Sequence, residues 1–262
     1  MKAVEYSKAL YKITRSDVIA KLRATPKAYQ AKIEDVVKQL KERGFAVFED
    51  YYTEEQCADL RTDIDQQLVT QKEFVQVDKE GADYRLFGGD RVSPLIHDFY
   101  HDDFLTQVRN CYYKHDGIVG CTLAARIQTT ENNRGSGGGW HRDMIYGRQL
   151  KAILYLSDVS EDNGPFQFME NTHRTSSILE TIQKCGIKAF QNRLSHEDID
   201  KIKAIGGYDV TTMLGKAGTL LIIDTTSIHR GKPLQAGKRY ALTNYYFEHK
   251  IPEHINKLIV SE

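Results

Sequence analysis

The chain has few cysteines, few prolines, no excess of charge and no long apolar run, and each shortage excludes a class of protein. Its four cysteines show neither the CxxC spacing of a zinc site nor the density of a secreted disulfide scaffold. We therefore expect reduced thiols that are mostly buried, at positions Cys57, Cys111, Cys121 and Cys185. Five prolines spread along 262 residues leave no proline-rich linker between domains.

The charge balance and the hydropathy exclude further classes. The 36 basic residues balance the 36 acidic ones, so the chain has no bulk electrostatic attraction to nucleic acid or to an anionic membrane. No apolar run reaches the length of a membrane span, and residues 1–7 are polar with no apolar stretch behind them. We therefore expect a cytoplasmic protein with neither a nucleic acid nor a membrane as partner.

Length and patterning favour one domain over residues 1–262, of which about 1–115 form a helical lead-in. Apolar residues between Ile33 and Leu40 recur at helical spacing and end at Gly44. A short strand at 45–48 and a capping box at 53–56, which opens a second helix, follow. The charged stretch at 78–85 is expected to form a surface loop over a pocket.

From about residue 116 to 250 the pattern is that of a jelly-roll core. Strands are expected at 122–129, 149–156, 218–223 and 240–247. A polar insert at 176–206 carries a helix start at 195–198. Helices followed by antiparallel strands predict a mainly β fold with α, a double-stranded β-helix of the jelly-roll or cupin type whose N-terminal helices pack on one sheet.

The most informative local motif is His141-Arg142-Asp143, which follows a glycine-rich loop at 132–139. In an extended segment, residues two apart point to the same side, so His141 and Asp143 can bind one metal ion while Arg142 faces away. His229 follows an apolar strand and could reach the pair through antiparallel strand pairing. Two imidazoles and one carboxylate leave three coordination positions open, the arrangement with which non-haem Fe(II) binds a cosubstrate and O₂.

A keto acid that donates electrons to such a centre would need a fixed cation for its far carboxylate. Arg239 stands ten residues after His229, at the start of an apolar strand, and its guanidinium can bind a carboxylate through two parallel hydrogen bonds. A lone HxD motif occurs by chance in many proteins. The full order is more specific: HxD, a strand, an Asn-Gly-Pro turn, an apolar strand, then His and Arg.

This order resembles the phytanoyl-CoA dioxygenase-like branch of the Fe(II)/2-oxoglutarate oxygenases, over most of the chain. The resemblance lies in the lead-in from residue 40, the segments 140–143 and 156–165, and the segment 229–239. It implies that His141, Asp143 and His229 are the catalytic iron ligands. It also implies that Arg239 binds the distal carboxylate of 2-oxoglutarate.

The resemblance and the neighbouring strands also suggest further positions. Gln128 and Tyr155 are candidates for hydrogen bonds to the cosubstrate, and Arg126 is a candidate to face the substrate. Trp140 and Tyr146 are further candidates for substrate contact, although an aromatic residue beside a strand is more often part of the core.

The chain also departs from the family pattern in three places. His173 fits a structural histidine after the Asn-Gly-Pro turn, in the segment Glu170-Asn171-Thr172-His173, and not a ligand. Gly231 stands where relatives carry a hydroxyl for the cosubstrate, so that bond must come from elsewhere or be absent. The carboxylate of Asp143 argues against halogenating chemistry, which needs a small residue at that position.

The implied reaction hydroxylates an unactivated C–H bond of a small molecule while 2-oxoglutarate and O₂ give succinate and CO₂. Desaturation or cyclisation by the same chemistry, and a non-oxidative jelly-roll metal-binding protein, are the alternatives. Several polar residues could surround the site: Arg126, Arg142, Tyr146, Arg148 and Lys232. If two or three of them point inward, the substrate carries a carboxylate or a phosphate.

Overall fold

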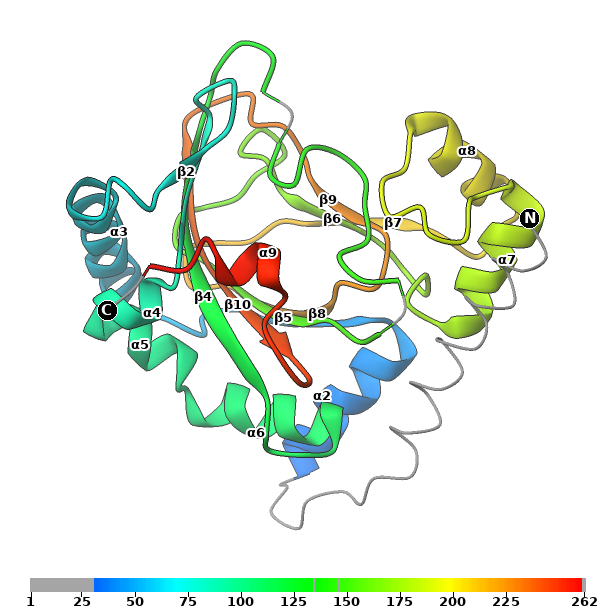
Figure 1. Cartoon of the computed structure of the whole chain (residues 1–262), viewed down its shortest axis with the longest axis horizontal. Coiled ribbons are helices and arrows are strands. Elements are labelled where there is room, and N and C mark those ends of the chain that lie inside the picture. Colours follow the sequence, from blue (N-terminus) through cyan, green and yellow to red (C-terminus); the bar gives the residue numbers. More distant parts are fainter. Residues whose placement is uncertain (1–30, 134, 146, 261–262) are drawn as a thin grey trace.

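The computed structural model describes residues 31–133, 135–145 and 147–260, and within them two antiparallel sheets face each other (Figure 1). The larger sheet consists, in spatial order, of β1 (Phe45–Phe48), β8 (Leu220–Asp224), β5 (Leu150–Tyr155), β10 (Lys238–Phe247), β4 (Val119–Gln128), β3 (Asp83–Phe87) and β2 (Gln76–Val77). The smaller sheet consists of β7 (Val210–Met213), β6 (Phe166–Met169) and β9 (His229–Gly231). This arrangement confirms the predicted jelly-roll type of fold, and the sheets do not close into a barrel.

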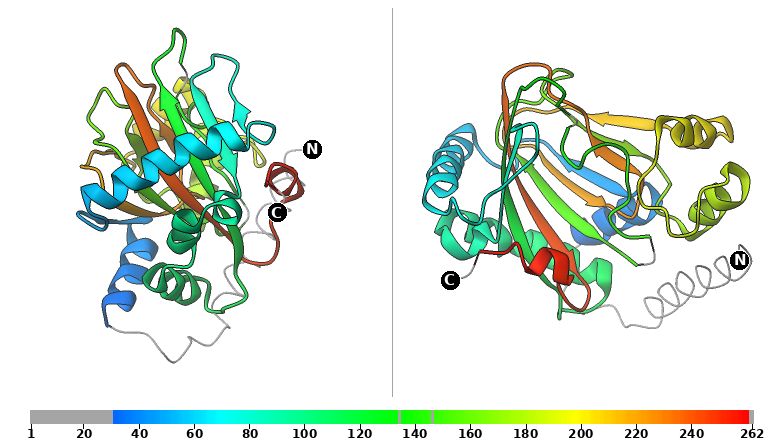
Figure 2. Two further views of the ribbon diagram at one scale, coloured as in Figure 1. Left: turned by 90° about the vertical axis from the view of Figure 1, so that its left-hand side faces the viewer. Right: turned by 45° about the horizontal axis from the view of Figure 1, so that its top comes forward.

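Helices cover the outer face of the larger sheet, as predicted (Figures 1 and 2). These are α2 (Ala31–Glu42), α3 (Glu54–Thr70), α4 (Gly89–Val92), α5 (Pro94–Tyr100) and α6 (Asp103–Tyr113). The insert between β6 and β7 forms α7 (Thr175–Cys185) and α8 (His196–Ala204), and α9 (Glu253–Asn256) follows β10. Among the described residues, no helix is both long and apolar enough to cross a bilayer.

Local sequence signals set the helix ends. Thr53 accepts a hydrogen bond from the backbone N–H of Gln56, whose side chain binds the Thr53 N–H, and Ser195 begins α8 with the same reciprocal cap. After α2 the chain turns at Gly44, where φ is +90° and an added Cβ would strike His173 and Phe168. Glycine is therefore required between α2 and β1.

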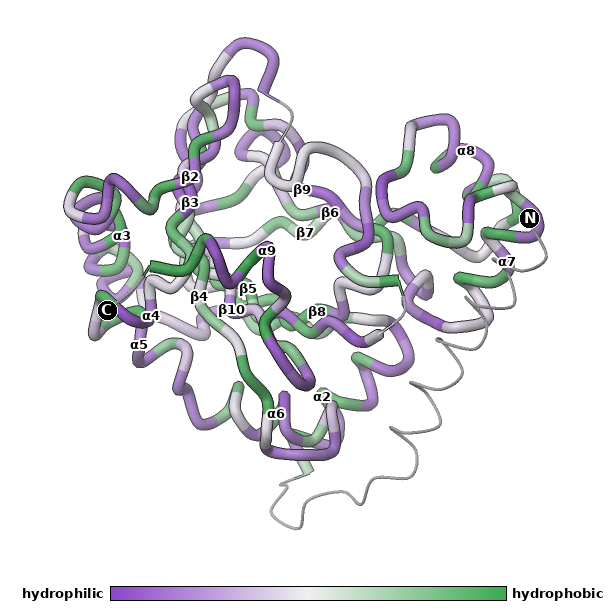
Figure 3. The backbone as a smooth tube through the Cα atoms, in the orientation of Figure 1, coloured by the Kyte–Doolittle hydropathy of each residue, from purple (hydrophilic) through white to green (hydrophobic). Residues whose placement is uncertain are grey.

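The strands at the centre of the larger sheet are buried on both faces. Side chains of β5 and β8 alternate between the helices on one side and the smaller sheet on the other. This double burial explains why both strands are apolar apart from Lys151 in β5 and Asp224 at the end of β8 (Figure 3). Phe168 of β6 is fully buried between the sheets, and burial of such a ring contributes about 1.5–3 kcal/mol.

Two features of the lead-in differ from the prediction. Of the loop predicted at 78–85, residues 78–82 connect β2 to β3, but residues 83–85 belong to β3, which pairs with β4. They form a strand because alternate residues of this segment meet the helices and the cavity between the sheets. Strands β1 to β3 also join the larger sheet, so the lead-in supplies part of the sheet itself. The four cysteines are free thiols, and three are buried.

Candidate metal centre

The backbone brings the two candidate histidine ligands side by side. His141 and His229 form an antiparallel bridge, in which each N–H donates to the carbonyl of the other at 2.9 Å. The N–H of Asp143 donates to the carbonyl of Thr225, just after β8, at 3.1 Å. These bonds hold the HxD segment between the two sheets, and strand pairing places His229 beside it.

The ligand atoms of the three side chains lie within 4.8 Å of one another. His229 Nε2 is 3.4 Å from Asp143 Oδ2, and His141 Nε2 is 3.7 Å from Asp143 Oδ1. Ligand atoms that share one cation at about 2.1 Å stand about 3–4 Å apart, so this spacing suits a single divalent ion. Arg142 points away, as expected, and donates to the carbonyls of Thr172 and Thr226.

Hydrogen bonds to the backbone set the tautomers of both imidazoles. His141 Nδ1 lies 2.8 Å from the carbonyl of Gly139, and His229 Nδ1 lies 2.8 Å from the carbonyl of Ser227. A carbonyl only accepts, so each Nδ1 carries the hydrogen and each Nε2 presents a lone pair. The donor set therefore fits a metal ion that prefers two imidazoles and a carboxylate.

The charge states of the site also favour a cation. Burial, followed by the neighbouring His141, lowers the pKa of His229 to about 4, so its imidazole is neutral near pH 7. Burial alone would raise the pKa of the Asp143 carboxyl, but Lys151 and His229 hold it well below its usual range. The site thus offers the neutral imidazole of His229 and the ionised carboxylate of Asp143.

These ligands line a cavity of about 340 Å³ between the sheets. Successive inward residues of β10 form one wall, because side chains two apart share a face: Arg239, Ala241, Thr243 and Tyr245. Neighbouring strands add apolar residues, namely Phe87, Leu123, Ile127, Ile153 and Phe166. His254 and Ile255 of α9, together with Leu258, complete the lining beside Tyr245 and Phe87.

Arg239 is a buried cation in this wall. One terminal nitrogen donates to the carbonyl of Gly164, and the buried Nε has no hydrogen-bond partner within the described residues. Burial lowers the pKa of the guanidinium, which nevertheless remains charged near pH 7. A buried guanidinium with an unused donor fits a carboxylate ligand, because an unsatisfied buried donor is costly.

Arg126 and Gln128 lie on the opposite face of the sheet, which corrects their predicted direction. On β4, Leu123, Ala125 and Ile127 line the cavity, so the residues between them face the helices. Arg126 binds Asp65 of α3 at 2.6 Å, and the Gln128 amide donates to the carbonyl of Gly81 at 3.3 Å. The predicted register of this strand was wrong by one residue.

Tyr155, Trp140 and Tyr146 have three different outcomes. Tyr155 lines the cavity, but its hydroxyl already donates to the carbonyl of Met213 at 3.0 Å, so its one hydrogen is not available to a carboxylate. Trp140 packs in the core under α8, and Arg230 lies 4.5 Å from its ring, so the core interpretation holds. Tyr146 lies outside the described residues.

The other polar residues predicted to surround the site mostly point elsewhere. Arg148 donates to the carbonyl of Tyr112, and Lys232 pairs with Glu161, away from the cavity lining. Several polar residues that the sequence interpretation missed do line the cavity, among them Arg85, Ser136, Lys151 and Arg193. Lys151 had a visible signal, a lysine within the otherwise apolar strand β5.

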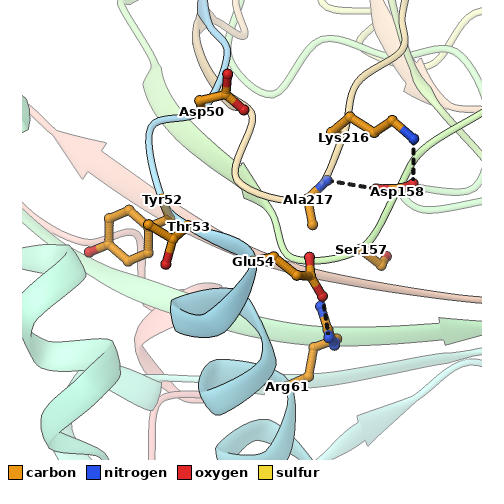
Figure 4. A pocket seen from close by; sticks show the side chains of 9 residues that line it. All are labelled: Asp50, Tyr52, Thr53, Glu54, Arg61, Ser157, Asp158, Lys216 and Ala217. Atoms are coloured by element: carbon orange, nitrogen blue, oxygen red, sulfur yellow. Dashed lines mark hydrogen bonds and ion pairs between the residues drawn. The ribbon is translucent and has the colours of Figure 1, made fainter.

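A second hollow of about 720 Å³ lies at the start of α3, between the turn after β1, the turn after β5 and the turn before β8 (Figure 4). It is larger and more open, but four of its charged side chains pair with one another. Arg61 pairs with Glu54 at 2.8 Å, and Lys216 pairs with Asp158 at 2.9 Å. Among the described residues, this hollow brings together no metal-ligand set, so the smaller cavity is the better candidate site.

The fold and the ligand set define a class, jelly-roll proteins with a two-histidine, one-carboxylate centre. The family model for phytanoyl-CoA dioxygenase (PhyH) matches residues 40–239, about three quarters of the sequence. The chain belongs to this family, which confirms the resemblance seen in its motifs. No protein with a curated description matches the sequence.

Solved structures of similar fold include enzymes that use α-ketoglutarate. The epimerase SnoN, in complex with Fe³⁺, α-ketoglutarate and nogalamycin RO, is 12% identical, with 83% of this chain and 84% of SnoN covered and a TM-score of 0.62. The carbocyclase SnoK from nogalamycin biosynthesis is 11% identical, with 90% and 93% covered and a TM-score of 0.59. HygX from Streptomyces hygroscopicus, with nickel, 2-oxoglutarate and hygromycin B, is 15% identical, with 81% and 86% covered and a TM-score of 0.54. At these identities the likeness shows the fold alone.

Proposed function

We propose that this chain is an Fe(II)- and 2-oxoglutarate-dependent oxygenase that hydroxylates an unactivated C–H bond of a small anionic molecule. The observation that carries the proposal is the placement of three metal-ligand side chains and the Arg239 guanidinium on the wall of one cavity. Family membership supports it, as do SnoN and HygX, whose structures contain a metal ion and the keto acid.

In this proposal His141, Asp143 and His229 hold Fe(II), and Arg239 binds the distal carboxylate of 2-oxoglutarate. A bound iron ion supplies the redox and O₂ chemistry that amino-acid side chains lack. The chain's own part is to fix both imidazole tautomers and to present an unused donor from Arg239. The apolar lining limits the access of water to the reacting groups.

The charge of the lining supports an anionic substrate. Among the described lining residues the basic side chains are Arg85, Arg142, Lys151, Arg193 and Arg239, and Asp143 is the one carboxylate. Arg85 is paired with Asp83 and Lys151 with Asp143, and Arg142 points away and donates to two backbone carbonyls. With Arg239 assigned to 2-oxoglutarate, Arg193 at the exposed rim is the cation proposed to meet an incoming anion. A concave site with excess positive charge raises the local concentration of anions.

The test begins with anaerobic addition of Fe(II) and 2-oxoglutarate to the purified protein. We expect a visible charge-transfer band and, on admission of O₂, formation of succinate. His141→Ala and Arg239→Ala should abolish both, whereas His249→Ala, which removes an exposed histidine outside the cavity, serves as the matched control. Absence of the band and of succinate from the unmodified protein would refute the proposal and favour a non-oxidative metal-binding protein.

The reaction outcome needs its own measurement, because SnoN is an epimerase and SnoK a carbocyclase. Small carboxylates and phosphates can be screened for compounds that stimulate succinate formation. The product of such a compound is then prepared under ¹⁸O₂. Hydroxylation predicts one labelled oxygen atom in the product. A product without label, with two hydrogens fewer or an inverted centre, would replace hydroxylation with one of the other outcomes.

A further inference from the structure

A buried lysine contacts the proposed carboxylate ligand. Lys151 Nζ lies 2.7 Å from Asp143 Oδ2, and its side chain is 7% exposed. On its other side, the ammonium lies 4.0 Å from the centre of the Tyr245 ring. Within the described residues Asp143 is the carboxylate that pairs with Lys151, and a buried ammonium without a counterion would be strongly unfavourable.

The fold fixes both partners of this contact. Lys151 is in the middle of the larger sheet, paired with Tyr245 on one side and with Ile223 on the other. Asp143 is held by the bond from its backbone N–H to Thr225. The two oxygens of Asp143 therefore have different surroundings, since Oδ2 lies 2.7 Å from the ammonium and 3.4 Å from His229 Nε2, whereas Oδ1 lies 3.7 Å from His141 Nε2.

We propose that Lys151 is a positioning residue that holds one oxygen of Asp143 in an ion pair. The carboxylate then binds a metal ion through its other oxygen only. This inference rests on the proposed function. A six-coordinate ion with three protein ligand atoms has three positions left, two for a chelating keto acid and one for O₂. If both carboxylate oxygens bound the ion, one of those three positions would be lost.

The experiment uses nitric oxide as a probe for the position left for O₂. Lys151→Met removes the ammonium and keeps a stem of similar length. Protein loaded with Fe(II) and saturating 2-oxoglutarate is exposed to nitric oxide without O₂, and the iron–nitrosyl signal is measured by electron paramagnetic resonance. We expect Lys151→Met to lower this signal by about 10-fold or more, the usual size of effect when a residue that orients a metal ligand is lost.

The control is Lys216→Met, which makes the same substitution at an exposed lysine that pairs with Asp158 outside the cavity, and should keep the signal. If Lys151→Met does not fold, Lys151→Gln replaces it, and we expect the same decrease in the nitrosyl signal. A normal signal in both Lys151 variants would overturn the inference. Weaker 2-oxoglutarate binding with a normal signal at saturation would also overturn it, because Lys151 would then bind the keto acid directly.

The failures of the two proposals are distinguishable. If the unmodified protein gives no charge-transfer band with Fe(II) and 2-oxoglutarate, the proposed function itself fails. If the unmodified protein gives the band and the nitrosyl signal, and the Lys151 variants give both unchanged, only the role of Lys151 fails.

Discussion

Gly137 supports the ring of His141, and its replacement by alanine tests how closely the glycine-rich loop defines the metal site. Its φ is +83°, and an added Cβ would overlap Cε1 of His141 and lie 3.1 Å from Nε2. The methyl group would have to displace the imidazole. Because Nε2 is the proposed ligand atom, we expect Gly137→Ala to weaken metal binding by about 10- to 100-fold, as changes in the support of a ligand commonly do.

The neighbouring Gly138 provides a matched control. Its φ is +69°, so Gly138→Ala carries a similar backbone cost, about 1–2 kcal/mol for an L residue in the left-handed region. The nearest atom to its added Cβ is Arg193 Nη1 at 3.6 Å, an ordinary contact. Both variants should therefore lose similar stability, and only Gly137→Ala should also lose metal affinity.

The assay combines urea denaturation of the metal-free proteins with calorimetric titration by Ni²⁺, which does not support turnover. The expected pattern is two similar unfolding midpoints and two different dissociation constants. Equal Ni²⁺ affinities for Gly137→Ala and Gly138→Ala would show that the His141 ring does not depend on this loop, and would refute the argument from steric contact.

Three further predictions follow from contacts away from the cavity opening. Burial raises the pKa of all four thiols, but only Cys185 among them is partly exposed. A thiol reagent at pH 8 should therefore modify native protein rapidly at Cys185 alone and react with all four cysteines after unfolding. Rapid modification of more than one cysteine in the native protein would contradict the packing. Tyr112→Phe removes the hydroxyl that donates to the buried Asp224 carboxylate at 2.5 Å. It should lower the free energy of unfolding, measured by urea denaturation, by about 1–3 kcal/mol. No loss of stability would imply that another group donates to Asp224. Arg126→Met should lower the free energy of unfolding by less than about 1 kcal/mol. It should leave the affinity for 2-oxoglutarate unchanged, as measured by titration of the charge-transfer band. A large loss of affinity would show that Arg126 belongs to the site.

The HxD motif and the helix starts could be predicted from the sequence because each depends on local geometry. Side chains two apart in an extended segment share a side, and a capping box needs only four consecutive residues. Both His141 and Asp143 therefore follow from one short motif. To predict that the Arg239 side chain points into the cavity, one needs only the further assumption that its strand lines the same cavity as the ligands.

The faces of β4 could not be predicted in this way, because they depend on pairing with a distant strand. Arg239 pairs with Ile127, and directly opposed residues of an antiparallel pair point to the same face. Once Arg239 points into the cavity, Ile127 does so too, and Arg126 must point out. The pairing partner of Arg239 is not visible in the sequence of either strand. For the same reason the position of Lys151 beside Asp143 required the folded structure.

The register of β10 therefore decides the composition of the site, and a buried polar cluster on its other face holds that register. Asn244 is fully buried on the helix side, accepts from Thr122 Oγ1 at 2.6 Å, and donates to the carbonyl of Phe99 and to the hydroxyl of Tyr246, each at 3.0 Å. A slip of one residue would turn Asn244 into the cavity and Arg239 out toward the helices. The slip would leave three buried polar groups without partners, at about 1–3 kcal/mol each. The helices of the lead-in thus help to place the arginine, although none of them contributes a side chain to the cavity wall.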